Sequence, residues 1–165
     1  MIAPGSPTAP EIRLAAPGDA PFIVGLTARF AGAGAPTWPD PARMAILFER
    51  GLGEIAEAVA ADRVPPDETI LIASVAGLPV GFIHLRSETS GLTLEPQGYI
   101  NALATTTEAE GQGIGRALLA AGEGWARRRG FRLLALETFG GNRRARDFYA
   151  HGGYEEETLR LVKRL

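Results

Sequence analysis

Residues 99–116 read YINALATTTEAEGQGIGR, in which a strand-like segment leads into alternate glycines. Apolar, aromatic and β-branched side chains over 99–105 indicate a strand. Gly111, Gly113 and Gly115 follow at alternate positions and lead directly into a segment with helical spacing. Glycine lets a backbone approach a ligand closely, and the amides of a first helical turn lack intrahelical partners. The stretch therefore predicts an anion site, suited to a diphosphate, where this helix begins.

Two familiar nucleotide motifs do not fit these glycines. A dinucleotide fingerprint needs Gly-x-Gly-x-x-Gly, but counting from Gly111 or Gly113 places Arg116 or Leu118 at the last position. A Walker loop ends in Gly-Lys-Ser/Thr, which the stretch also lacks. The residues alone leave open which phosphate-bearing ligand binds, and a glycine-rich loop before an ordinary core helix remains an alternative.

The flanking segments predict a mixed α/β domain with helices packed on one sheet. Hydrophobic periodicity and turn residues place strands at 12–15, 69–76, 80–86, 98–105 and 133–138, and helices after Asp19, over about 41–61, over 113–129 and over 142–150. Gly51 and Gly53 are expected to break or bend the second helix. The alternating tail 154–165 predicts one or two further antiparallel strands.

Length and composition favour one soluble globular domain. The chain has 165 residues, 45% hydrophobic and 22% charged, which predicts a leader over 1–10 and a single domain over 11–165. The net charge of −2 gives no reason to expect a nucleic-acid partner. With no Cys and only two His, a metal site is not expected. No signal peptide or membrane span is expected either, which indicates a cytoplasmic protein.

Two motifs together resemble the GNAT superfamily of N-acetyltransferases. Residues 110–115, Glu-Gly-Gln-Gly-Ile-Gly, resemble its acetyl-CoA motif Arg/Gln-x-x-Gly-x-Gly/Ala, and residues 134–154 are similar to a second family element. The matching positions of the second element are Leu134-Ala135-Leu136-Glu137, Asn142, Ala145, Phe148-Tyr149 and Gly152-Gly153-Tyr154. The likeness covers roughly 11–165. Glu110 departs from the usual Arg or Gln, and its carboxylate should repel a diphosphate unless it turns to solvent or to an arginine.

The resemblance implies a mixed, mostly antiparallel sheet flanked by helices. The strand at 99–105 would part from the strand at 133–138 and leave an opening for acetyl-CoA. The expected cofactor-binding residues are Leu103, Ala104, Thr105, Gly111, Gln112, Gly113, Ile114, Gly115, Arg116, Asn142, Arg146 and Tyr149. Asn142 could equally be a helix cap alone. Arg143 and Arg144 share with Arg146 the option of meeting the 3′-phosphate or simply facing solvent.

The resemblance also implies direct acetyl transfer to a primary amine, because no Cys is available for a covalent relay. Tyr149 is the expected general acid, although by itself it reads as a packing residue. Asn101 takes the position where the family often has an acidic base and cannot serve, so Glu95 is the first candidate. Glu88, His84 and Tyr99 follow Glu95 as candidates.

The acceptor stays open between a small-molecule and a peptide amine, and the assembly could be a homodimer. A non-catalytic CoA-binding or sensor module on the same fold is the alternative function. Glu110 and the missing acid at Asn101 are the features that favour it.

Overall fold

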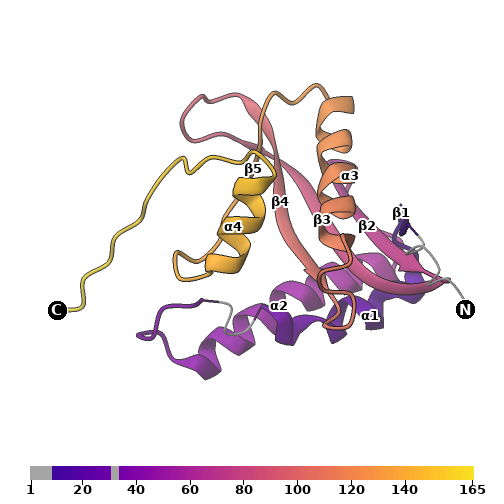
Figure 1. Ribbon diagram of the computed structural model, residues 1–165, viewed down its shortest axis with the longest axis horizontal. Helices are drawn as coiled ribbons and strands as arrows, with labels where there is room; N and C mark the ends of the chain where they lie inside the picture. The colour runs from indigo at the N-terminus through magenta and orange to yellow at the C-terminus, as the bar shows by residue number, and fades with distance from the viewer. Residues whose placement is uncertain (1–8, 31–33) are drawn as a thin grey trace, which may run out of the picture.

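The computed structural model describes residues 9–30 and 34–165, so residues 1–8 of the expected leader lie outside the described chain. The elements in chain order are β1 (Glu11–Leu14), the 3₁₀ helix η1 (Pro17–Asp19), α1 (Ala20–Gly25), the 3₁₀ helix η2 (Thr27–Arg29), α2 (Pro41–Ala60), β2 (Glu68–Val75), β3 (Leu78–Thr89), β4 (Pro96–Thr105), α3 (Ile114–Arg128), β5 (Leu134–Leu136) and α4 (Arg143–His151). Figure 1 shows their arrangement.

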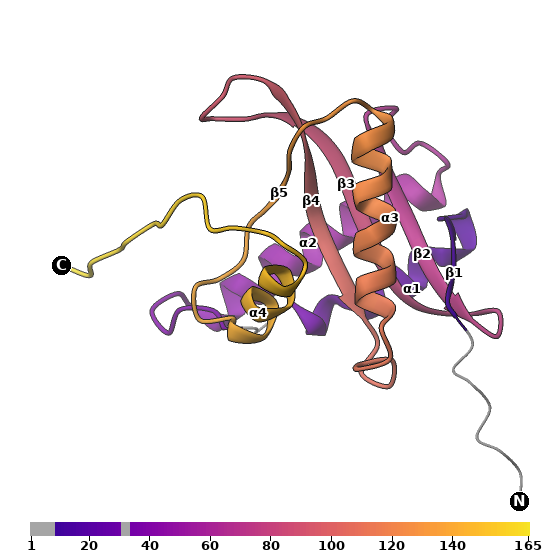
Figure 2. The ribbon, with the colours of Figure 1, turned by 45° about the horizontal axis from the view of Figure 1, so that its top comes forward.

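The strands form one five-stranded sheet in the order β1-β2-β3-β4-β5. The first three pairs are antiparallel and only β4 and β5 run parallel. Alternate side chains of a strand face opposite sides, and β3 accordingly sends Phe82 toward α1 and α2 and Ile83 toward α3. Figure 2 shows α3 in front of the sheet and α2 behind it. The expected mostly antiparallel sheet flanked by helices is confirmed.

The two parallel strands separate after a short contact. Pairing between β4 and β5 covers only Gly98–Ile100 with Leu134–Leu136. From there β4 continues to Thr105 along β3, while the chain leaving β5 turns toward α4. The predicted splayed strand pair is therefore present, although β5 is shorter than the expected strand at 133–138.

Helix α2 is continuous over Pro41–Ala60, so Gly51 and Gly53 do not break it as expected. Each glycine costs a helix about 1 kcal/mol relative to alanine. The apolar stripe of Leu52, Ile55, Ala56 and Val59 is buried against the sheet, and this packing outweighs that cost. Within 9–30 and 34–165, no helix has both the length and the apolar content to cross a bilayer.

The strands predicted in the tail 154–165 are wrong, because the structure has no strand there. Leu159 and Leu161 are 77% and 83% exposed, and the tail runs from α4 away from the sheet (Figures 1 and 2). Alternating apolar residues give a segment one apolar face, but a strand also needs a neighbour for its backbone hydrogen bonds. No described strand pairs with the tail.

Candidate active site

The start of α3 presents free backbone amides. Gly113 is the N-cap, with a φ of 80°, and no side chain caps the helix within the described chain. Gly111 also has a positive φ, 74°. An added Cβ at either glycine would meet nothing within 4 Å, so the backbone conformation rather than lack of space requires glycine. The first intrahelical bond comes from Ala117 to Gly113, which leaves the amides of Ile114, Gly115 and Arg116 without an intrahelical partner and available for an anion.

A pocket of about 760 Å³ opens beside these amides, between the far half of β4, the start of α3 and α4. The structure brings most of the expected cofactor residues to its wall: Leu103, Ala104, Thr105, Gly111, Gly113, Ile114, Gly115, Arg116, Asn142 and Tyr149. Two segments far apart in the sequence thus meet at one pocket. The separation of β4 from β5 makes this possible.

Three expected residues lie outside this wall. Gln112 is directed back into the loop, because its backbone amide donates to the Ala109 carbonyl at 3.4 Å and its side chain donates to the Glu108 carbonyl at 2.6 Å. Arg146 donates from Nε to Glu156 at 2.9 Å. Glu95 precedes β4 at the end opposite Thr105, where its carboxylate lies 3.9 Å from Arg132. The structure therefore does not bring Glu95, the first candidate for the base, to the pocket.

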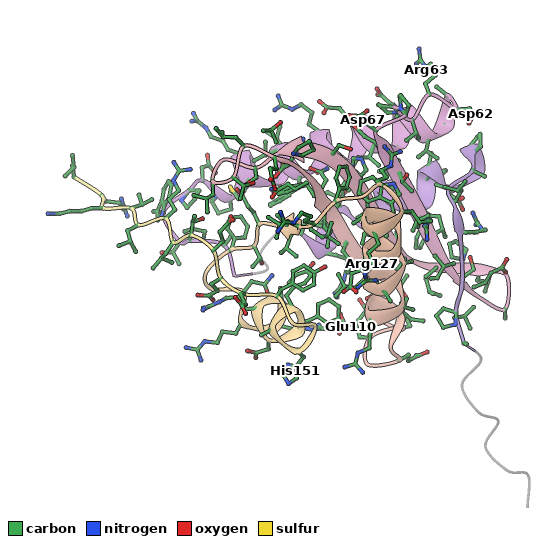
Figure 3. All side chains as sticks on the ribbon, turned by 90° about the horizontal axis from the view of Figure 1, so that it is seen from above. Asp62, Arg63, Asp67, Glu110, Arg127 and His151 are labelled. Atoms are coloured by element: carbon green, nitrogen blue, oxygen red, sulfur yellow. The ribbon has the colours of Figure 1, made fainter. Side chains whose placement is uncertain are left out.

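Glu110 lies between two arginines on the pocket wall. Its Oε1 accepts from Arg29, and its Oε2 lies 2.8 Å from Nη1 of Arg144. Arg29 also donates from Nε to the Thr105 carbonyl at 3.2 Å, which ties η2 to the end of β4. Figure 3 shows Glu110 between α3 and α4, with His151 on the outer side of α4. The negative charge of Glu110 is thereby compensated, and no local sequence pattern pointed to Arg29.

Tyr149 reaches the pocket from α4. Asn142 caps this helix by accepting from the Ala145 amide at 3.1 Å, as the sequence predicted for a cap. The Tyr149 ring packs at 5.1 Å from Phe148 and 5.6 Å from Tyr154, between ring centroids. Burial raises the pKa of the Tyr149 phenol to about 12, because an apolar environment disfavours phenolate. Tyr149 is therefore a protonated group throughout the physiological range.

An aromatic wall closes the α1–α2 side of the pocket. Phe30 stacks on Phe48 at 6.2 Å, and Phe48 meets Phe139 edge-on at 6.4 Å. All three rings line the pocket. Nothing local in the sequence distinguishes an aromatic such as Phe48 that faces a cavity from one that packs into the core.

Asn101 faces the pocket and contacts a buried histidine. Its Nδ2 lies 3.0 Å from Nδ1 of His84, whose Nε2 lies 2.7 Å from Oε2 of Glu68. Burial lowers the pKa of His84, and the hydrogen bond that His84 donates to Glu68 only partly opposes this. Burial therefore favours the neutral form of the ring. The other two candidates for the base, Glu88 and Tyr99, lie outside the pocket wall.

Relatives of known sequence agree with this arrangement. The acetyltransferase (GNAT) family matches residues 36–154. An uncharacterized N-acetyltransferase, YhfO of Bacillus subtilis, is 36% identical over 104 residues, which is 62% of this chain and 70% of that protein. An aminoglycoside N(6′)-acetyltransferase type 1 of Stenotrophomonas maltophilia is 31% identical over 163 residues, covering 94% of this chain and 92% of the relative.

Solved structures share the fold. A GCN5-related N-acetyltransferase from Ralstonia eutropha has a TM-score of 0.70 at 20% identity, with 94% of this chain and 98% of that one covered. The structure of AAC(6′)-Iy in complex with a CoA bisubstrate analogue has a TM-score of 0.68 at 18% identity, covering 96% and 100%. The matched family spans most of the chain, including β4, the glycine loop and α4. The chain therefore belongs to the acetyltransferase (GNAT) family and is an N-acetyltransferase.

Proposed function

We propose that residues 11–165 form one domain that transfers acetyl from acetyl-CoA directly to a primary amine. The amine nitrogen would attack the thioester carbonyl, so that a C–N bond forms and the C–S bond breaks. The departing thiolate would take a proton from the Tyr149 phenol, and the amine would give its surplus proton to solvent. The Tyr149 phenolate would then regain a proton from solvent. We also retain a cytoplasmic location and a homodimer as predictions.

The uncapped first turn of α3 carries this proposal. Its amides face a pocket that β4 and α4 also line, with Tyr149 on the same wall. Unpaired amides at a helix start attract phosphate oxygens, and the exposed edge of β4 beyond Ile100 offers backbone groups to an extended pantetheine arm. Because Arg29 and Arg144 compensate the charge of Glu110, its carboxylate does not prevent a diphosphate from binding here.

A small-molecule amine is the acceptor class that we propose. The Stenotrophomonas relative, similar along nearly the whole chain, is named for acetylating aminoglycosides at a 6′ amine. The aromatic wall of Phe30, Phe48 and Phe139 gives the acceptor an apolar surface to pack against. Aminoglycosides are therefore the first acceptors to test, ahead of peptides.

Thermal unfolding tests the cofactor. A ligand at about 100 times its Kd stabilises a protein by roughly 2.7 kcal/mol, which corresponds to a rise in Tm of about 5–10 °C at this chain length. We expect acetyl-CoA to give this rise, and NAD and ATP to give none. Stabilisation by NAD or ATP without stabilisation by CoA would overturn the proposal.

Thiol release tests the reaction. Neomycin and paromomycin differ only in an amine or a hydroxyl at the 6′ carbon, so they form a matched pair of acceptors. We expect acetyl-CoA-dependent thiol release with neomycin to exceed that with paromomycin at least tenfold. Equal rates would show that the reacting amine is not the one on the 6′ carbon. Tight CoA binding without turnover of any amine would favour the sensor function.

Glu110→Gln is expected to tighten CoA binding. The variant keeps the shape of the side chain but leaves the charges of Arg29 and Arg144 uncompensated near the anion site. Partly exposed ion pairs contribute about 0.2–1 kcal/mol, so the Kd should fall roughly 1.5- to 5-fold, more at low salt. Calorimetric titration measures this, with the exposed Glu157→Gln as the charge-matched control. Weaker binding by Glu110→Gln would show that Glu110 instead builds the site.

A further inference from the structure

Asn101 lies at an irregularity in the pairing of β3 with β4. His84 pairs with Ala102 and Leu85 pairs with Ile100, so Asn101 is the extra residue of a β-bulge. A bulge turns a side chain out of the regular alternation of a strand. Ile100 is also the last residue of β4 that pairs with β5, which places Asn101 where the two strands begin to part. Asn101 therefore lines the pocket at the point where β4 and β5 separate.

The hydrogen bonds behind Asn101 determine how its amide is oriented. The Glu68 carboxylate can only accept, so Nε2 of His84 must carry the ring proton at their 2.7 Å contact. In a neutral ring Nδ1 is then an acceptor. The contact of 3.0 Å between Nδ1 and Nδ2 of Asn101 is therefore a donation from the Asn101 amide. As a result the other end of the amide, the carbonyl Oδ1, is directed away from His84, on a residue that lines the pocket.

We propose that Oδ1 of Asn101 binds the acceptor amine by accepting an N–H hydrogen bond, and that Glu68 and His84 act as positioning residues that fix this orientation. An oxygen acceptor repels the thioester carbonyl and attracts an N–H donor, so it selects the amine rather than the acyl group. Asn101 holds the amine without removing a proton. This inference deepens the proposed N-acetyltransferase activity and rests on it.

The orientation depends on the charge state of His84. The charged groups acting on its ring are Glu68 from β2, which favours protonation, and Arg86 from β3, which disfavours it. A protonated ring would donate from both nitrogens, and the amide of Asn101 would then have to reverse and show its NH₂ group to the pocket. Burial of His84 opposes protonation, which keeps Oδ1 directed at the pocket at neutral pH.

Nitrogen NMR of the histidine ring tests the orientation without any substrate. In the free wild-type protein at neutral pH we expect the His84 signals of a neutral ring protonated at Nε2. Glu68→Gln removes the obligatory acceptor, so we expect a mixture of both tautomers. Glu88→Gln is the matched control, because Glu88 accepts a strand-to-strand bond from Gln97 at 2.9 Å and should leave the His84 signals unchanged. A wild-type ring protonated at Nδ1 would overturn the inference.

Steady-state kinetics with acetyl-CoA and neomycin test the amine contact. Asn101→Ala should raise the KM for neomycin about tenfold or more, the effect of losing one hydrogen bond to a charged group, with the KM for acetyl-CoA within twofold. Asn101→Asp keeps an oxygen at this position and should restore the neomycin KM. An active wild-type protein with an unchanged neomycin KM in Asn101→Ala would overturn the inference alone. A wild type that turns over no amine would overturn the proposed function and the amine contact together.

Discussion

Gly113→Val is expected to lose CoA binding by about 100-fold or more. Valine has to adopt a φ of 80° at this position, which costs a β-branched residue about 1–2 kcal/mol, and relieving that strain reorients the amides of the first turn. Each hydrogen bond from an amide to a charged phosphate contributes about 1.5–3 kcal/mol. Misalignment of only two of them accounts for the loss. Calorimetric titration with CoA measures it.

Gly130→Val is the matched control for this substitution. Gly130 follows the other end of α3, has a φ of 76°, and an added Cβ there would also meet nothing within 4 Å. Both variants should therefore lose similar stability, while only Gly113→Val should lose CoA affinity. Equal CoA affinity in the two variants would show that the diphosphate binds elsewhere.

Tyr149→Phe is expected to lower kcat about 100-fold or more while the KM for acetyl-CoA stays within twofold. The substitution keeps the ring packing against Phe148 and Tyr154 and removes only the proton that the leaving thiolate would take. General acids contribute about 10²–10⁴ to a rate. Initial rates with acetyl-CoA and neomycin give both constants.

Tyr154→Phe separates chemistry from packing. The Tyr154 ring touches that of Tyr149, and its buried hydroxyl has no hydrogen-bond partner in the described part of the chain. Removing this hydroxyl should leave kcat unchanged. The pKa of Tyr149, raised to about 12 by burial, also means that its ionisation should not reduce kcat between roughly pH 7 and pH 10. A loss of kcat in Tyr154→Phe equal to that in Tyr149→Phe would assign both effects to packing.

The sequence predicted those parts of the site that depend on local backbone chemistry. Alternate glycines before a helix predict an uncapped helix start whatever surrounds them, and Gly111 and Gly113 have the positive φ angles that favour glycine. Asn142 likewise caps α4 by accepting a hydrogen bond from a backbone amide only three residues along the chain. Local signals of this kind are complete within a few residues, so they can be read without the fold.

The features of the site that the sequence did not predict depend on tertiary contacts. Arg29 reaches Glu110 across 81 residues, and Asn101, His84 and Glu68 come together only because β2, β3 and β4 are neighbours. The bulge that turns Asn101 toward the pocket is a property of the paired strands and has no signature in one of them. Glu95 precedes β4, but a strand places its two ends far apart, so the carboxylate of Glu95 lies away from the pocket.

A crystal structure with acetyl-CoA bound tests directly whether the diphosphate binds at the start of α3. We expect the diphosphate oxygens to lie within hydrogen-bond distance of the amides of Gly113, Ile114 and Gly115, with the thioester near Asn101 and Tyr149. A complex in which the cofactor lies elsewhere, or in which those amides face solvent or side chains instead, would contradict the assignment of this site to acetyl-CoA.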